Sequence, residues 1–279
     1  MSAGFSVKVP ACVVETCYEH EGVIVPNIMP LKALKRLRNF AVRPDDLFIV
    51  TYPKSGTTWA EQVMMLIRYN GNLNKLEGKH IMKLIPFLEH VKDIANPSVL
   101  YVARNPKDTA VSFYHFCHYV GPMPSYESWD VFFEEFITGR TPQGSWFENV
   151  LPWWRRRNHP NVLFLKYEDM IKDLPTAVRQ IAHFMGKSLS DDVIKQISRA
   201  STFEAMKSNP SANPDSIISP TIHRENNQSF MRKGIIGDWK NYFTADQNRR
   251  FDELYQKKLS STGLVMQFEA KAPFIPSLY

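Results

Sequence analysis

A strand, a short glycine-containing loop and a helix, in direct succession, constrain this chain more than any other stretch. Residues 47–51 (LFIVT) form an apolar run with β-branched side chains that ends before Pro53, which predicts a fully buried strand. From Thr57 onward apolar side chains recur at helical spacing. Gly71 follows the last turn, where a helix C-terminus favours a residue with positive φ. The pattern therefore places a tight loop directly before a helix N-terminus.

The loop between this strand and helix has the composition of an anion site. The first N–H groups of a helix have no partner within the helix, and the helix dipole favours negative charge there. Gly56 lets the backbone close around a ligand, and Lys54 adds a positive charge. Hydroxyl donors are present at Ser55, Thr57 and Thr58. The lysine precedes the glycine, so the loop departs from the P-loop pattern G-x-x-x-x-G-K-[ST], and an ordinary strand-to-helix turn is the alternative.

The composition is that of a globular protein with a substantial core. The chain has 279 residues, of which 44% are hydrophobic, and no apolar run approaches the length of a membrane span. The N-terminus lacks the layout of a signal peptide, and three cysteines without metal spacing predict reduced thiols and a cytoplasmic location. The net charge of +6 is spread along the chain, so a small polyanion suits it as well as nucleic acid would. We find no linker and predict a single domain over residues 1–279.

Two further apolar runs, at 99–103 (VLYVA) and 162–166 (VLFLK), predict buried strands that alternate with helices. This order predicts an α/β fold with a central parallel sheet flanked by helices. Ligands of such sheets bind beyond the carboxyl ends of the strands. Lys54, Arg104 and Tyr167 all follow strand ends, so we expect them to share one site. A surface salt bridge is the alternative for Arg104.

Other segments complete the predicted elements. A short strand is expected at 23–25, and helices at 31–40, 175–185, 191–200 and 245–259. The segment 208–228, rich in Asn, Ser and Pro, predicts a long loop and a candidate lid. After it, Arg232 and Lys233 precede Gly234 and form a second candidate anion-binding element, for which a solvated basic turn is the alternative.

Five segments, in this order, resemble the cytosolic sulfotransferases, which transfer a sulfuryl group from 3'-phosphoadenosine-5'-phosphosulfate to a hydroxyl or amine. They are residues 51–59 (TYPKSGTTW), 101–112 (YVARNPKDTAVS), 144–147 (GSWF), 167–170 (YEDM) and 232–240 (RKGIIGDWK). The resemblance runs from about residue 22 to about residue 268. It implies a P-loop-like nucleotide site, a small-molecule acceptor and a reaction without a metal, because the donor supplies its own activated sulfate.

The resemblance also implies a role for each matching residue. The 5'-phosphosulfate end would be held by residues from Lys54 to Trp59, with Lys54 catalytic and Trp59 near the adenine. The 3'-phosphate would be held by Arg104, Ser112, Arg232, Lys233 and Gly234. The rest of the nucleotide pocket would comprise Tyr167, Ser201, Thr202, Phe203 and Met231. Phe87 and Phe116 fall where the family's acceptor pocket has aromatic residues.

The chain departs from the family at its general base. The family carries a His-Leu-Pro, whose histidine takes the acceptor's proton, between the Pro-Phe-Leu-Glu feature at 86–89 and the strand at 99–103. Here only HVKDIANPS separates Glu89 from Val99, and no His-Leu-Pro occurs. A positioned base contributes roughly 10²–10⁴-fold to the rate. His90 is a candidate substitute base, and a structural histidine is the alternative.

A second departure lies in the family's dimerisation signature, Lys-x-x-x-Thr-Val-x-x-x-Glu. Here its positions are Lys240, Thr244, Ala245 and Arg249, which predicts a monomer or a weak homodimer. Three functions stay open from the sequence: an active sulfotransferase, a pseudoenzyme of that family that binds the nucleotide, and a P-loop nucleotide kinase. We expect neither nucleic acid nor membrane as a partner.

Overall fold

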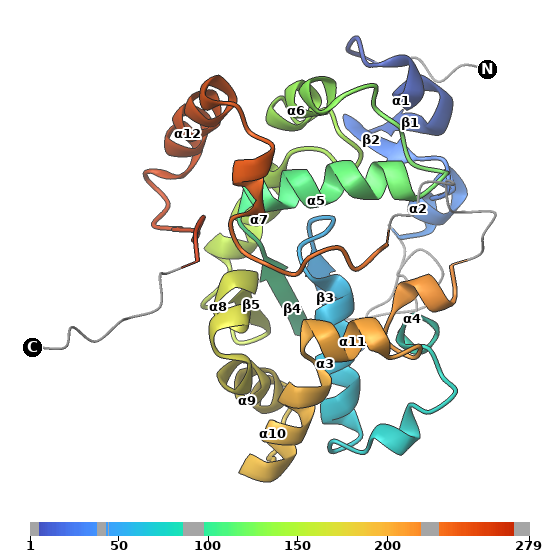
Figure 1. The fold of residues 1–279 in the computed structure, drawn as a ribbon, viewed down its shortest axis with the longest axis vertical. Coiled ribbons are helices and arrows are strands. Elements are labelled where there is room, and N and C mark those ends of the chain that lie inside the picture. The colour runs from blue at the N-terminus through green and yellow to red at the C-terminus, as the bar shows by residue number, and fades with distance from the viewer. Residues whose placement is uncertain (1–5, 38–42, 44, 86–97, 219–228, 271–279) are drawn as a thin grey trace, which may run out of the picture.

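The centre of the protein is a parallel sheet of three strands (Figure 1). The computed structural model describes residues 6–37, 43, 45–85, 98–218 and 229–270. The strands β3 (Leu47–Thr51), β4 (Ser98–Ala103) and β5 (Val162–Lys166) lie in the order β3-β4-β5. Val50 pairs with Tyr101, and Tyr101 with Phe164. The predicted α/β fold with a parallel sheet is confirmed.

Side chains alternate between the two faces of the sheet, and each face packs on a separate group of helices. Leu100 and Val102 join one apolar core, while Tyr101 and Ala103 join the other. The first core includes residues of α3 (Thr57–Arg68), α8 (Tyr167–Lys172), α9 (Leu174–Phe184) and α10 (Asp191–Ala200). The second includes residues of α5 (Pro106–Tyr119), α6 (Trp129–Ile137), α7 (Trp146–Arg155) and α12 (Ala245–Leu259).

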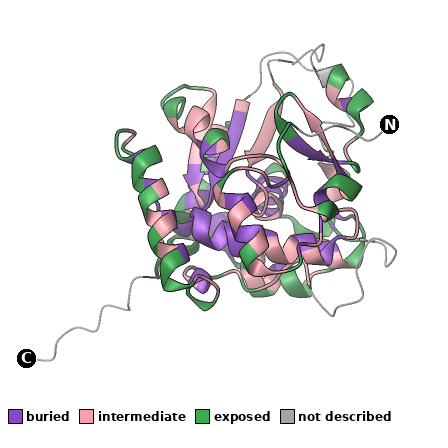
Figure 2. Ribbon diagram, turned by 90° about the horizontal axis from the view of Figure 1, so that it is seen from above, coloured by how far each residue is buried: buried purple, intermediate pink, exposed green. Residues whose placement is uncertain are grey.

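The prediction of a fully buried strand at 47–51 is wrong, and so is the prediction of a buried strand at 162–166. Every residue of β3 is partly exposed, and Leu165 alone is buried in β5, whereas β4 is buried from Val99 to Ala103. The reason is the strand order, because β4 alone has a neighbour on each side in the described sheet. Figure 2 shows the buried residues gathered in the sheet and the helices that cover it.

The remaining elements surround this sheet. The hairpin of β1 (Cys17–His20) and β2 (Val23–Pro26) confirms the short strand expected at 23–25, and the helices expected near 175–185, 191–200 and 245–259 are confirmed as α9, α10 and α12. The helix expected at 31–40 is α2 (Leu31–Leu37), with the rest of that range outside the described residues. Shorter helices are α1 (Ala11–Thr16), α4 (Ile81–Leu84) and α11 (Phe203–Ser208), with 3₁₀ turns at Leu73–Lys75, Pro214–Ser216 and Asp238–Asn241. No helix in the described ranges is both long and apolar enough to cross a membrane.

Candidate active site

A cavity of about 800 Å³ lies beyond the carboxyl ends of β3 and β4 and gathers most of the residues singled out from the sequence. Those that line it are Lys54, Gly56, Thr57, Thr58, Trp59, Arg104, Ser112, Phe116, Tyr167, Ser201, Thr202, Phe203, Met231, Arg232, Lys233 and Gly234. Ser55 does not line it, because its side chain is fully buried beneath the loop. Phe87 and His90 lie outside the described residues, so their roles stay predictions.

The loop between β3 and α3 is held in a tight, left-handed conformation. Gly56 is the N-cap of α3 with φ of 109°, and a Cβ there would lie 3.0 Å from the ring of Tyr167. Lys54 also has a positive φ of 65°, which is rare for a residue with a side chain and marks local backbone strain. The hydroxyls of Thr51 and Thr57 lie 2.6 Å apart and join the end of the strand to the start of the helix. The first turn of α3 is thereby fixed at the cavity wall.

The ammonium group of Lys54 lies between two aromatic rings. Its Nζ lies 3.5 Å from the ring centroid of Phe230 and 4.7 Å from that of Phe116. Burial, followed by the charge of Arg104, lowers the pKa of Lys54 to about 7. No carboxylate in the described ranges lies within ion-pair distance of this nitrogen. The charge of Asp215 offsets this lowering of the pKa only in part, so a bound anion would supply a further counter-charge.

Arg104 connects the loop after β3 to the segment that follows residue 231. Its guanidinium donates to the carbonyls of Lys54 (3.2 Å) and Ile235 (3.3 Å) and lies 4.5 Å from the ring centroid of Tyr167. Next to it, Asn105 caps α5, as the sequence predicts, by accepting from the N–H of Asp108. The alternative of a surface salt bridge is wrong, because Arg104 is only 6% exposed and these contacts lie inside the protein.

The second candidate anion element is anchored to the start of α5. The carboxylate of Asp108 accepts from the N–H groups of Gly237 (2.7 Å) and Trp239 (3.0 Å). Asp238 forms ion pairs with both Arg232 and Lys233 at 2.5 Å. Burial opposes ionisation of Asp238, but the hydrogen bonds from Lys233, Asn241 and Arg232 outweigh it and lower the pKa. The turn is therefore a built element rather than a solvated basic turn.

The wall opposite these cations is aromatic. Trp59 lies edge-on to Tyr167, with 5.1 Å between their ring centroids, and its Nε1–H donates to the carbonyl of Ser201 at 2.7 Å. Phe203 packs against Gly234, where a Cβ would lie 2.3 Å from its ring. These contacts hold planar side chains beside the cationic loops, an arrangement suited to a nucleotide with a base and phosphates.

Some residues of the site escaped the sequence analysis. Phe230 covers Lys54, and it is held by Asp215, which accepts from its N–H (2.9 Å) and from the hydroxyl of Ser229 (2.5 Å). Asp215 lies in the described part of the loop predicted at 208–228, and the lid role of that loop stays a prediction. No local pattern marks these residues, because the contact joins segments separated by residues 219–228.

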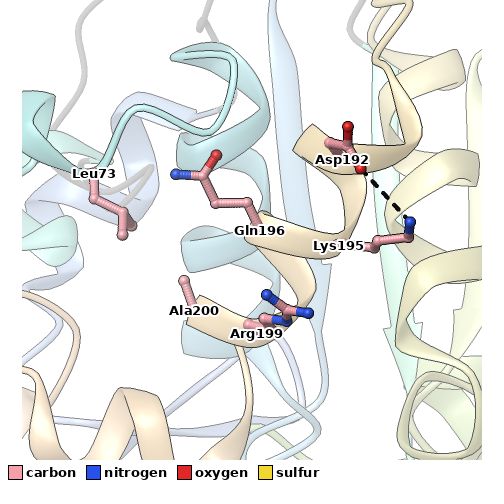
Figure 3. Close-up of a pocket in the computed structure, with 6 residues that line it drawn as sticks. All are labelled: Leu73, Asp192, Lys195, Gln196, Arg199 and Ala200. Carbon is pink, nitrogen blue, oxygen red and sulfur yellow. Dashed lines mark ion pairs between the residues drawn. The ribbon is translucent and has the colours of Figure 1, made fainter.

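A second hollow, of about 540 Å³, lies between α10 and the 3₁₀ turn at Leu73–Lys75 (Figure 3). It contains none of the residues predicted for the site. An exposed ion pair of Asp192 and Lys195, 3.6 Å long, lies at its rim. Its lining residues are Leu73, Asp192, Lys195, Gln196, Arg199 and Ala200.

Comparison with known proteins places the chain in a family. The family model described as "Sulfotransferase domain" matches residues 44–98 and 92–263. Human Sulfotransferase 1C2 is 37% identical over an alignment of 261 positions that covers 82% of this chain and 88% of the relative. The amine sulfotransferase of Oryctolagus cuniculus is 36% identical over 266 residues, with coverages of 85% and 88%. The chain belongs to the sulfotransferase family.

Solved structures agree with this assignment. Mouse sulfotransferase SULT7A1, in complex with PAP, superimposes with a TM-score of 0.72 at 33% identity, covering 89% of this chain and 95% of that one. Retinol dehydratase, also in complex with PAP, gives a TM-score of 0.77 at 24% identity, with coverages of 88% and 90%, a likeness that shows the fold. The two matched segments of the family model overlap at residues 92–98.

Proposed function

We propose that this chain transfers a sulfuryl group from 3'-phosphoadenosine-5'-phosphosulfate to the hydroxyl or amine of a small acceptor. The observation that carries the proposal is the convergence of four cationic side chains on one cavity with an aromatic wall. These are Lys54, Arg104, Arg232 and Lys233. Membership of the sulfotransferase family, and the PAP bound in the mouse relative, support the same donor.

Within this proposal, the two loops take the two ends of the nucleotide. The loop from Lys54 to Thr58 would bind the 5'-phosphosulfate, since its helix N-terminus and its ammonium group both favour an anion. The 3'-phosphate would lie between Arg104, with Ser112 beside it, and the element from Arg232 to Gly234. The adenine would pack among Trp59, Tyr167 and Phe203, with Ser201, Thr202 and Met231 around them. Ser55 would support the shape of the loop, since its hydroxyl is buried and its backbone N–H donates to the carbonyl of Tyr52.

Charge development explains why Lys54 is the catalytic residue of this proposal. As the bond between sulfur and the donor's phosphate oxygen breaks, negative charge grows on that oxygen. An ammonium group already placed in a dry site stabilises that charge without the cost of reorganising water. The apolar environment that lowers the pKa of Lys54 also strengthens its attraction to the leaving oxygen.

The acceptor would enter from the aromatic side of the cavity. Phe116 and Phe230 flank Lys54, and Val120 and Ile218 extend the apolar lining. A phenol, an alcohol, a steroid or an amine with an apolar body suits such a wall. Phe87 is proposed to add to it. We further propose a cytoplasmic location and a monomeric or weakly dimeric state, with neither nucleic acid nor membrane as a partner.

The first test is a calorimetric titration of the purified protein with adenosine 3',5'-bisphosphate. We expect saturable binding that is weakened by Lys54→Ala and by Arg232→Ala. Lys240→Ala is the matched control, because Lys240 is exposed and pairs with Glu269 away from the cavity. An absence of binding by a folded protein would contradict the proposal.

Two activity assays separate the alternative functions. A pseudoenzyme would bind the product nucleotide but give no sulfated product with the sulfonate donor and a phenol, alcohol or amine panel. A nucleotide kinase would hydrolyse a nucleoside triphosphate in the presence of Mg²⁺, or would transfer a phosphoryl group from it. The proposed enzyme would do neither. Sulfated product formed without added metal would support the transferase.

A further inference from the structure

Asp215 joins segments that form the apolar side of the cavity, and the function proposed above gives it no role. Its Oδ1 accepts from the hydroxyl of Tyr119 and, at 2.9 Å, from the N–H of Phe230. Its Oδ2 accepts from the hydroxyl of Ser229 at 2.5 Å. One carboxylate therefore connects the end of α5 to the segment whose ring covers Lys54.

The hydrogen bond from Tyr119 gives this connection a rigid base. Tyr119 is 2% exposed, and burial, followed by the hydrogen bond to Asp215, raises its pKa. Its hydroxyl therefore stays protonated near neutral pH and donates to the carboxylate. A hydrogen bond from a hydroxyl to a carboxylate is stronger than one between neutral groups, so α5 fixes the position of Asp215.

Each segment that meets at Asp215 contributes to the apolar lining where the acceptor would enter. Residues of α5 close to Tyr119 belong to this lining, as do the second and third residues after Asp215. The lining residues concerned are Phe116, Val120, Ile217, Ile218 and Phe230. The ring of Phe230 lies edge-on to those of Phe116 and Tyr119, with centroids 5.8 Å and 6.3 Å away. The carboxylate thus holds together the acceptor side of the cavity.

Phe230 in turn holds the ammonium group of Lys54. Nζ lies 3.5 Å from the ring centroid of Phe230 and donates to the carbonyl oxygen of the same residue, also at 3.5 Å. The face of an aromatic ring attracts a cation, and more strongly where water is excluded. Burial and Arg104 lower the pKa of Lys54, and the charge of Asp215 raises it. Asp215 therefore influences both the position and the charge of this ammonium group.

We propose that Asp215 is a positioning residue for sulfuryl transfer, which holds Phe230 against the ammonium group of Lys54 and supports that group with its own charge. The inference rests on the proposed function. Asp215 is not among the residues that line the cavity, so it acts through these two neighbours rather than by touching donor or acceptor. The ammonium group and the acceptor wall then keep one arrangement as the sulfuryl group passes between them.

The first test compares the wild type, Asp215→Ala and Asp215→Asn at about pH 6, below the pKa of Lys54. The readout is sulfated product from the phenol, alcohol or amine that the wild type sulfates best. Asp215→Ala removes the carboxylate, and kcat/KM should fall roughly 10–100-fold, since a displacement of about 1 Å can cost 10²-fold. Asp215→Asn keeps an Oδ1 that accepts from Tyr119 and Phe230, so it should keep most of the activity at this pH.

A double-mutant comparison connects the effect to Phe230. In a Phe230→Ala background there is no ring to hold, so adding Asp215→Ala should cost only a small part of the loss that it causes in the wild type. Asp130→Ala is the matched control, because Asp130 on α6 accepts from the amide of Gln247 on α12 at 2.7 Å and does not line the cavity. Saturable binding of adenosine 3',5'-bisphosphate by each variant shows that it folds.

The pH profile gives a readout that a merely structural role would not move. Lys54 acts when protonated, so wild-type kcat/KM should fall as the pH rises past about 7. Asp215→Asn removes a negative charge that raises the pKa of Lys54, so the fall should begin at a lower pH. The other titratable groups that line the cavity or shift this pKa are Glu61, Arg104, Cys117, Tyr167, Glu204, Arg232 and Lys233. They are the same in both proteins, so the shift reports the charge at position 215.

Each outcome decides one point. If Asp215→Ala is as active as the wild type, or loses as much with the ring of Phe230 as without it, the role of Asp215 is overturned and the proposed function stands. An Asp215→Asn profile that does not move overturns it as well. A wild type without transfer to any acceptor overturns the proposed function and this inference with it. If Asp215→Ala does not fold, Tyr119→Phe decides: a smaller loss that disappears in the Phe230→Ala background supports the role, and full activity overturns it.

Discussion

Replacing Gly234 by alanine should weaken nucleotide binding through a contact that no sequence pattern reveals. Gly234 has φ of +67°, and an added Cβ would lie 2.3 Å from Cδ2 and 2.7 Å from Cγ of Phe203. Such a contact between the added Cβ and the ring of Phe203 is too short, so either the ring or the loop that carries Arg232 and Lys233 must move. Both groups belong to the proposed nucleotide site, so binding should suffer whichever of them moves.

Two terms set the size of the effect. A left-handed conformation costs an alanine about 1–2 kcal/mol, and overpacking adds about 1–3 kcal/mol. Gly78 separates them, because it has φ of +68° with nothing within 4 Å of an added Cβ. With unfolding entropy near 2.1 cal/mol/K per residue, 279 residues lose roughly 2 °C of Tm per kcal/mol. Gly78→Ala should therefore lower Tm by about 2–4 °C, and Gly234→Ala by about 4–10 °C.

The assay is calorimetric titration with adenosine 3',5'-bisphosphate beside a thermal melt. If the bound state needs the original loop position, the overlap of about 1–3 kcal/mol weakens binding by roughly 5–150-fold. Gly78→Ala should bind as the wild type does. In a Phe203→Ala background the ring is gone, so adding Gly234→Ala should cost only the backbone term. Equal affinities of the wild type and Gly234→Ala would refute the reasoning.

Three further expectations follow from the site and the surface. Because the pKa of Lys54 is about 7, nucleotide binding above that pH takes up a proton, and affinity should fall as the pH rises past 7. Titrations in buffers of different ionisation enthalpy measure this proton uptake. Lys54→Met should abolish it. Asp108→Ala should lower both Tm and nucleotide affinity. The N–H groups of Gly237 and Trp239 would lose the carboxylate that accepts from them, at about 1.5–3 kcal/mol per bond. Unchanged affinity would show that the loop keeps its shape without Asp108. Arg249 pairs within α12 in place of the family's acid, so light scattering at micromolar concentration should give a monomer or a weak dimer, and a dimer alone would contradict this.

The sequence by itself determined most of the local elements and which of the predicted site residues lie together. Glycine and hydroxyl residues after an apolar run defined the loop at Lys54, and Asn105 with Pro106 marked the start of α5. Parallel strands bring their carboxyl ends to one edge, so Lys54, Arg104 and Tyr167 were expected together from strand positions alone. These signals are local because backbone sterics and helix capping act over a few residues.

Tertiary structure alone decided what surrounds those residues. The partial exposure of β3 and β5 depends on strand order, which no single strand's composition encodes. Phe230 reaches Lys54 across 176 residues of chain. No sequence pattern singles out Glu61, and only the packing of α3 shows that its side chain is buried and lines the cavity. Desolvation and long-range contacts depend on the assembled neighbourhood, and for that reason they shift the pKa values of Lys54 and Glu61 in ways that the sequence by itself leaves open.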